Sequence, residues 1–231
     1  MDLNYLAEYL PVLMDATKVT AILTVVTLIL STVIALPLSV VGLRKPNAFS
    51  AALDLFTLFM RSIPTLVVLF FFYYGMPYLG LVLPAFAVAV VGLTLSAVAY
   101  NIEIFRSGLR AVDPGQIEAA EALGIPRWRI WVNIAFPQAM PVFLPTYLSN
   151  ATLILKGTSV ASIITIPELT AVSNEIVSLT YQPFEILIAS ALIYVVLGGA
   201  LSLIAAAVRR HLTRGLSAGP VRSAPAMKAS A

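Results

Sequence analysis

Long charge-free stretches dominate the chain, and the charged residues stand between them. These stretches cover residues 19–43, 62–102, 130–155 and 186–208. A helix needs about 20 apolar residues to cross the roughly 30 Å hydrocarbon core of a bilayer. Three of the stretches are close to that length, and 62–102 has room for two helices. The pattern predicts several membrane-spanning helices.

Turn residues fix how the stretches divide. Gly75, Pro77, Gly80 and Pro84 interrupt the longest one. The sequence predicts an all-α membrane protein with five transmembrane helices, with spans near 19–43, 61–78, 82–105, 138–156 and 185–208. Residues 157–167 are apolar but too short to cross, which predicts a re-entrant or interfacial segment.

The two ends of the chain carry different patterns. Leu3, Leu6, Leu10 and Leu13 recur at helical spacing and predict a short interfacial helix ahead of the first span. Residues 217–231, rich in Ala, Ser and Pro, predict a disordered tail. Residues 1–216 then form one membrane domain.

Composition excludes most other classes of protein. The 231 residues are 60% hydrophobic and 11% charged, whereas soluble domains carry about 25% charged residues. There is no cysteine, which excludes a disulfide scaffold, and His211 is the only histidine. We therefore predict no catalytic site, no metal site and no cofactor.

Basic residues set the expected orientation. Twelve of the fourteen lie on one predicted side: Arg44, Lys45, Arg61, Arg106, Arg110, Arg127, Arg129, Arg209, Arg210, Arg214, Arg222 and Lys228. Because Lys and Arg accumulate on the cytoplasmic side, the N-terminus is expected outside and the C-terminus in the cytoplasm. They flank apolar runs, which indicates contact with membrane lipid and no nucleic-acid partner.

Residues 113–135, between the third and fourth predicted spans, have the signals of a rigid element. Asp113 and Gln116 are spaced as in a capping box around Pro114, and Gly124 follows the expected helix end. Trp128, Trp131 and Ile134 then recur at three-residue spacing in a second short helix. These signals leave open a surface connection between spans or a docking element that offers Glu118 and Glu121 to a partner.

The spacing in this loop resembles a known motif. Glu118-Ala119-Ala120, three residues, Gly124, nine residues and then Ile134-Ala135-Phe136-Pro137 is similar to the EAA loop of ABC importer permeases, with Phe136 in place of Leu. Residues 61–64, 100–106 and 156–159 resemble polar amino-acid permeases of the histidine, glutamine, arginine and glutamate type, although Gly157 stands where that family commonly has Asp.

The resemblance implies a fold, a function and a set of partners. It implies the type I ABC importer permease fold and a translocation subunit for polar amino acids or related compounds such as opines, in the bacterial inner membrane. The implied partners are two cytoplasmic ATPase subunits, an external solute-binding protein and a second permease chain, identical or paralogous. The sequence has no Gly-x-x-x-x-Gly-Lys-Ser/Thr loop, so ATP hydrolysis is expected in another chain.

Other transport functions remain as alternatives at this point. One is a permease for another small solute, such as methionine or a quaternary amine. A second is a stand-alone channel or secondary carrier, although no internal repeat is visible in the sequence. Co-purification with an ATPase would separate an importer permease from a channel or carrier.

Two groups of candidate site residues follow. The resemblance assigns ATPase coupling to Glu118, Ala119, Ala120, Gly124, Ile134 and Pro137. Polar residues along or just after the fourth span are candidates for the substrate path: Asn150, Thr152, Lys156, Thr158 and Ser159. Of these, Thr152, Lys156 and Ser159 are spaced to share a helix face.

Three charged residues near these spans also have simpler interpretations. Lys156 can instead extend to the outer interface or neutralise Glu168. Glu103 and Arg106, three residues apart, are predicted to form a pair on one helix.

Overall fold

The structure is a computed structural model that describes residues 3–43 and 47–213, and helices make up almost all of these two ranges. The all-α fold class is therefore confirmed. The main helices are α1 Leu3–Gly42, α2 Ala48–Ser62, α3 Thr65–Phe70, α4 Ala85–Arg110, α5 Pro114–Ala122, α6 Arg127–Ile130, α7 Phe136–Gly157, α8 Leu169–Thr180 and α9 Pro183–Thr213. The predicted tail, 217–231, lies outside the described residues.

The N-terminal segment differs from the prediction. No separate interfacial helix precedes the first span, because α1 runs without a break from Leu3 to Gly42. At 1.5 Å per residue it is roughly 60 Å long. Leu13 is fully buried, and Leu6 packs beside it against Leu169 and Ile186 of α8 and α9. Leu6 and Leu13 therefore contact protein, whereas Leu10 is exposed.

The second predicted span also differs. The chain is broken at Ser62–Pro64, and the segments Ala48–Ser62 and Thr65–Leu79 meet at an angle of 101°. The helix expected over 61–78 starts later, at Thr65, and runs to Leu79 through a π-helical and a 3-10 turn, and α2 was not predicted. Asn47 starts α2 with a capping box closed by Ser50. Arg61, expected beside the first loop, lies in the last turn of α2 with its guanidinium 5.4 Å from the Tyr100 ring centroid.

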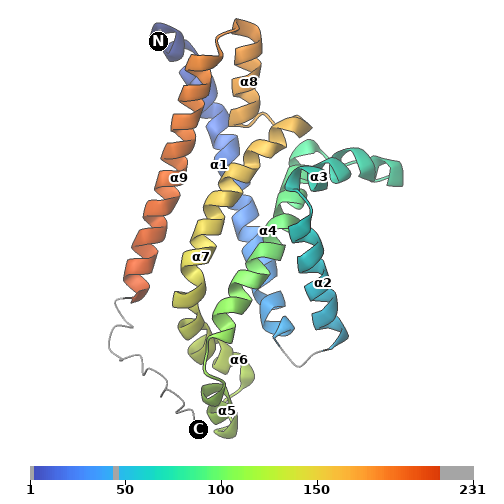
Figure 1. The fold of residues 1–231 in the computed structure, drawn as a ribbon, viewed down its shortest axis with the longest axis vertical. Helices are drawn as coiled ribbons and strands as arrows, with labels where there is room; N and C mark the ends of the chain where they lie inside the picture. Colours follow the sequence, from blue (N-terminus) through green and yellow to red (C-terminus); the bar gives the residue numbers. More distant parts are fainter. Residues whose placement is uncertain (1–2, 44–46, 214–231) are drawn as a thin grey trace, which may run out of the picture.

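Helix α4 forms the centre of the bundle and packs against α1, α2, α3 and α7 (Figure 1). A stripe of small hydroxyl residues on α1 is buried in the bundle: Thr17, Thr20, Thr24, Thr27 and Ser31. Thr17 and Thr24 each donate a hydrogen bond to the backbone carbonyl four residues earlier. Self-satisfied small side chains let helices approach closely in a membrane.

The end of α4 lies close to α7. A Cβ at Gly108 would lie 2.8 Å from the Ala139 carbonyl oxygen and 2.7 Å from Phe143 Cδ1. Phe105 packs edge-on to Phe143 and stacks on Tyr147. The base of the loop between these helices is therefore tightly packed.

The segment after α7 enters the protein interior. Residues Thr158–Ile164 form a 3-10 helix whose Ala161 and Ile164 are buried with Leu23, Leu69 and Val88. Thr165, with φ 66°, then turns the chain into α8. The short apolar segment predicted at 157–167 thus packs among α1, α3 and α4.

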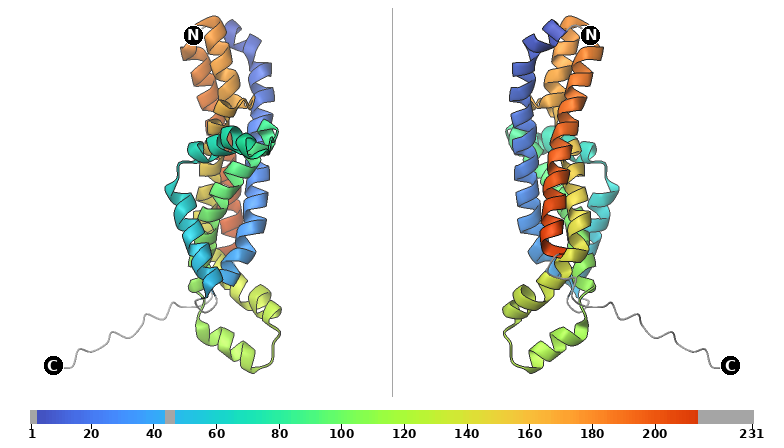
Figure 2. Two further views of the ribbon diagram at one scale, coloured as in Figure 1. Left: turned by 90° about the vertical axis from the view of Figure 1, so that its right-hand side faces the viewer. Right: turned by 90° about the vertical axis from the view of Figure 1, so that its left-hand side faces the viewer.

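Within the described residues, three helices are long and apolar enough to span a membrane: Leu6–Gly42, Ala85–Arg110 and Pro183–Arg210. Two bent pairs bring the total to as many as five if each pair is one span: Ala48–Ser62 with Thr65–Leu79, and Arg127–Ile164 with Leu169–Thr180. Helices α5 and α6 project beyond one end of this bundle, and α8 lies toward the other (Figures 1 and 2).

Candidate functional site

The projecting element, residues 113–135, contains α5, α6 and a π-helical turn at Trp131–Ala135. We call it the knob. It joins the end of α4 to the start of α7, and Figure 2 shows it protruding from the bundle. The helix–bend–helix expected from the sequence is present.

Local hydrogen bonds determine where the knob turns. Asp113 caps α5 by accepting a bond from the Gly115 amide at 2.9 Å. At the other end, the Gly124 amide donates to the Glu121 carbonyl at 3.0 Å and the Ile125 amide to the Ala120 carbonyl at 3.1 Å. This pair of bonds is the Schellman motif, which requires a left-handed residue, and Gly124 has φ +72°.

The second half of the knob is not one regular α-helix. Helix α6 is only four residues long, and the π-helical turn after it changes the helical register. Ile130 is buried and Trp131 packs on the bundle core, whereas Trp128 is 62% exposed with the Arg129 guanidinium 5.2 Å from its ring centroid. The three-residue spacing therefore does not define one buried stripe.

Side-chain bonds attach the knob to the bundle and close its turn. Gln116, predicted to complete the capping box, accepts a 2.6 Å bond from Gln138 on α7. Ile117 packs against the core formed by α4 and α7. Across the Gly124 turn, Arg127 Nε lies 3.3 Å from Glu121 Oε1. The knob is thus tied to both of its flanking helices.

Five of the six predicted coupling residues lie in the knob, and Pro137 follows it at the start of α7. Glu118 and Ala119 are exposed, Ala120 is buried, and Gly124 has open space around its Cα. Ile134 is half-buried in the π-helical turn, and Pro137 is exposed in the first turn of α7. Leu123, beside Gly124, is 80% exposed. A rigid projection with exposed apolar side chains is typical of a protein contact surface.

The substrate-path candidates do not share one face. Asn150 is buried and donates a 2.9 Å bond to Asn101 on α4, which donates to Ser31 on α1. Thr158 is buried at the start of the 3-10 helix. Because α7 ends at Gly157, Ser159 leaves the helical register that Thr152 and Lys156 follow. The structure separates the five residues.

One hollow follows the junction of α4 and α7. Its inner part, of about 240 Å³, is lined by Thr65, Leu93, Ser96, Ala97, Tyr100, Asn150, Leu153, Ile154 and Gly157. A second part, of about 380 Å³, shares Tyr100, Asn150 and Leu153 with it and adds Arg61, Glu103, Ile104, Ser107, Thr146 and Ser149. The Ser96 hydroxyl is buried without a hydrogen-bond partner among the described residues.

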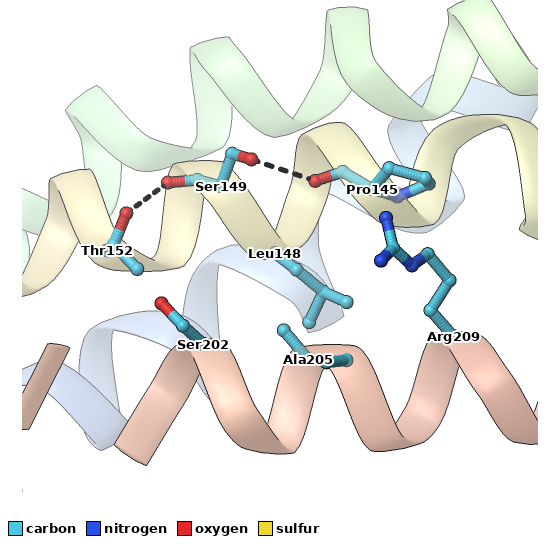
Figure 3. Close-up of a pocket in the computed structure, with 8 residues that line it drawn as sticks. Pro145, Leu148, Ser149, Thr152, Ser202, Ala205 and Arg209 are labelled. Atoms are coloured by element: carbon cyan, nitrogen blue, oxygen red, sulfur yellow. Dashed lines mark hydrogen bonds between the residues drawn. The ribbon is translucent and has the colours of Figure 1, made fainter. Parts of the chain in front are cut away.

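Thr152 lies at a second depression, between α7 and α9. Figure 3 shows this groove of about 260 Å³, with Ser149 and Thr152 on one wall and Ser202 on the other (Figure 3). Arg209 extends from α9 toward Pro145 of α7. The hydroxyls of Ser149 and Thr152 donate to carbonyls of their own helix. Thr152 therefore lines a different depression from Asn150.

Glu168 has a structural role that the sequence did not indicate. It caps α8 by accepting a 2.8 Å bond from the Ala171 amide, and it accepts a 3.0 Å bond from the Tyr194 hydroxyl. Lys156 is exposed, and no described ion pair joins it to Glu168.

The Glu103–Arg106 pair is present at 3.0 Å, but it has a third member. Arg106 Nη1 also lies 2.6 Å from Asp54 Oδ1 on α2. The sequence contains one indication of this third member, because Asp54 is the only acidic residue between Asp15 and Glu103. A carboxylate isolated in an apolar region calls for a cationic partner.

Comparisons with known proteins agree with this geometry. Residues 28–217 match the model of a family described as "Binding-protein-dependent transport system inner membrane component". The nopaline transport system permease protein NocM of Agrobacterium fabrum is 36% identical over 205 residues, covering 84% of this chain and 85% of that protein. The arginine transport system permease protein ArtQ of Bacillus subtilis is 30% identical, covering 92% of this chain and 97% of that protein.

Solved structures support the same fold. The crystal structure of an amino acid ABC transporter with histidines matches at a TM-score of 0.82 and 29% identity, covering 91% of this chain and 99% of that one. The inward-facing MetNI methionine ABC transporter matches at a TM-score of 0.74 and 18% identity, covering 92% and 99%, and so shares the fold. The chain belongs to the family of binding-protein-dependent transport system inner membrane components.

Proposed function

We propose that this chain forms part of the pathway of an ATP-driven importer for polar amino acids or opines, and that the knob is its ATPase-docking element. The knob carries this proposal, since it is rigid and presents Glu118, Leu123 and Trp128 to solvent. Relatives named as permeases of amino-acid and opine transport systems support the substrate class. The ATPase and the external binding protein are separate partners, and a second permease chain completes the pathway.

The orientation proposed is a cytoplasmic knob in the bacterial inner membrane. Arg110, Arg127 and Arg129 lie at the knob end of the bundle, as cytoplasmic residues would. Toward the other end, Lys18 is paired with Asp15 at 2.7 Å, which neutralises its charge. The N-terminus is then outside and the crossings number five, with α2/α3 and α7/α8 as bent spans.

The proposed mechanism is mechanical coupling. ATP binding draws the two ATPases together, and a knob seated in each carries the displacement to α4 and α7. Packed elements shift as units, and the close contact of Gly108 with Ala139 and Phe143 makes these two helix ends one unit. The α4/α7 hollow then changes its exposure as these helices tilt, and we assign the substrate path to it.

The hollow fits the chemistry of a free amino acid. Arg61 offers a cation to a carboxylate, and Glu103 offers an anion to an ammonium group. Ser96 and Asn150 lie deeper, with apolar Leu93 and Ile154 beside them. Small-molecule sites combine an apolar lining with a few polar groups in this manner.

Docking is tested by reversing one exposed charge on the knob. We expect Glu118→Lys to reduce co-purification of the partner ATPase at least tenfold, because a like-charge contact at an interface costs several kcal/mol and about 1.4 kcal/mol is already tenfold. The matched control is Glu175→Lys, an exposed glutamate on α8 near the opposite end. Equal ATPase recovery with both variants would contradict the docking assignment.

A further inference from the structure

Arg106 is a buried cation that connects three helices. It lies on α4 with only 1% of its surface exposed, and its Nη1 contacts Asp54 of α2 at 2.6 Å and Glu103 of its own helix at 3.0 Å. The Asp54 side chain is 63% exposed, so this carboxylate reaches the buried guanidinium from the surface.

The guanidinium also lies against the end of α1. A Cβ at Gly42, the last residue of α1, would lie 2.1 Å from Arg106 Nη2 and 2.9 Å from its Cζ. The terminal carbonyls of a helix carry partial negative charge, which favours a cation at that place. Arg106 Nε and Nη2 are buried and have no hydrogen-bond partner among the described residues. The cluster therefore has donors left for further bonds.

Helix α2 is the element whose position this cluster can control. It begins at the cap formed by Asn47 and ends at the 101° break after Ser62. One face packs on the core through Leu53 and Met60, while Leu55 and Leu58 are exposed on the other. The Arg106–Asp54 pair adds a fixed polar contact to this one-sided apolar packing.

The same cluster touches the walls of the α4/α7 hollow. Glu103, which accepts a bond from Arg106, lines the hollow. Arg61, which also lines the hollow, is carried by the last turn of α2, two turns beyond Asp54. The position of α2 therefore determines the position of Arg61 relative to Tyr100 and Glu103.

We propose that Arg106 is a positioning residue that holds α2 against α4 and so sets the width of the substrate hollow. It acts one turn before the knob, since α4 ends at Arg110. A displacement of the knob is then transmitted through the Arg106–Asp54 bond to α2, and so to Arg61 at the hollow. This inference rests on the proposed function, because it assigns substrate to the hollow.

The test measures the distance between α2 and α7 by pulsed electron paramagnetic resonance. The chain has no native cysteine, so spin labels go only on introduced cysteines at Leu55 of α2 and Val142 of α7, both exposed. Doubly labelled chains are diluted with unlabelled chain in the purified transporter complex. We expect Asp54→Asn to shift and widen the distribution by about 2 Å or more, the size of a helix shift.

Three further variants separate the role of the ion pair from general damage. Asp54→Glu keeps a carboxylate and should restore the wild-type distribution. Asp15→Asn, which removes an exposed pair within α1, should leave it unchanged. Glu103→Gln keeps the Asp54 bond and should leave the α2–α7 distance unchanged.

The distance result and the transport result are independent. A wild-type distribution in Asp54→Asn would overturn the positioning role, even if import by the wild type is normal. A shifted distribution together with a wild type that imports nothing in the presence of ATP would support the positioning role and contradict the proposed function.

Discussion

Replacing Gly124 with valine should abolish most ATP-driven import while the chain remains folded in the membrane. Gly124 has φ +72°, and a β-branched residue held there costs about 1–3 kcal/mol. No atom lies within 4 Å of a Cβ at this position, so the substitution causes no clash. The valine instead opposes the Schellman turn and rotates α6 away from α5. We expect the rate of uptake to fall about tenfold, because about 1.4 kcal/mol of this strain corresponds to a factor of ten.

Two substitutions make this result specific. Gly124→Asn should retain most of the uptake, because asparagine tolerates the left-handed conformation. Gly198→Val, in α9, also has open space around the new Cβ and no positive φ, so it should import normally. Proteoliposome uptake and ATP hydrolysis are measured side by side. Normal coupling in Gly124→Val would show that the turn geometry is irrelevant to transport.

Filling the α4/α7 hollow should block import without affecting ATPase docking. Leu153 is 62% exposed and lines both parts of the hollow. Leu153→Trp places an indole in cavities of about 240 and 380 Å³. We expect uptake to fall about tenfold or more, because losing a single well-placed contact with the solute already costs on that order.

The control for this variant is Leu55→Trp, on the exposed face of α2. It introduces the same side chain away from the hollow and should leave uptake unchanged. ATPase co-purification should equal the wild-type value in both variants. If Leu153→Trp imports at the wild-type rate, the substrate path lies elsewhere, and the α7/α9 groove at Thr152 becomes the next candidate.

Some parts of the fold could be predicted because their causes are local. Asp113 and Gly124 determine the ends of α5 through hydrogen bonds to residues two and three positions away. The charge-free stretches located α4, α7 and α9, because the length of an uncharged run is also a local property of the sequence. Helix α2 was missed because Asp54 and Arg61 interrupt its apolar run, and the charge that explains Asp54 lies 52 positions further along the chain.

The candidate site residues likewise divide into those positioned by local spacing and those positioned by contacts with distant segments. Residues of the knob were found by spacing, and the structure places them in one projecting element. Helical spacing also grouped Thr152, Lys156 and Ser159, but the helix ends at Gly157 and the three diverge. Asn150 donates to Asn101 on α4, and Asn101 donates to Ser31 on α1, so contacts between distant segments determine the orientation of Asn150.

The central claim is that this chain conducts solute only when an ATPase acts on its knob. The direct measurement is uptake of radiolabelled arginine, glutamine and nopaline into proteoliposomes that contain this chain with its second permease chain, its partner ATPase and its binding protein. The account predicts import of at least one of these solutes that needs ATP and stops when the ATPase is left out. Solute movement that continues without the ATPase would contradict it and identify a channel or secondary carrier.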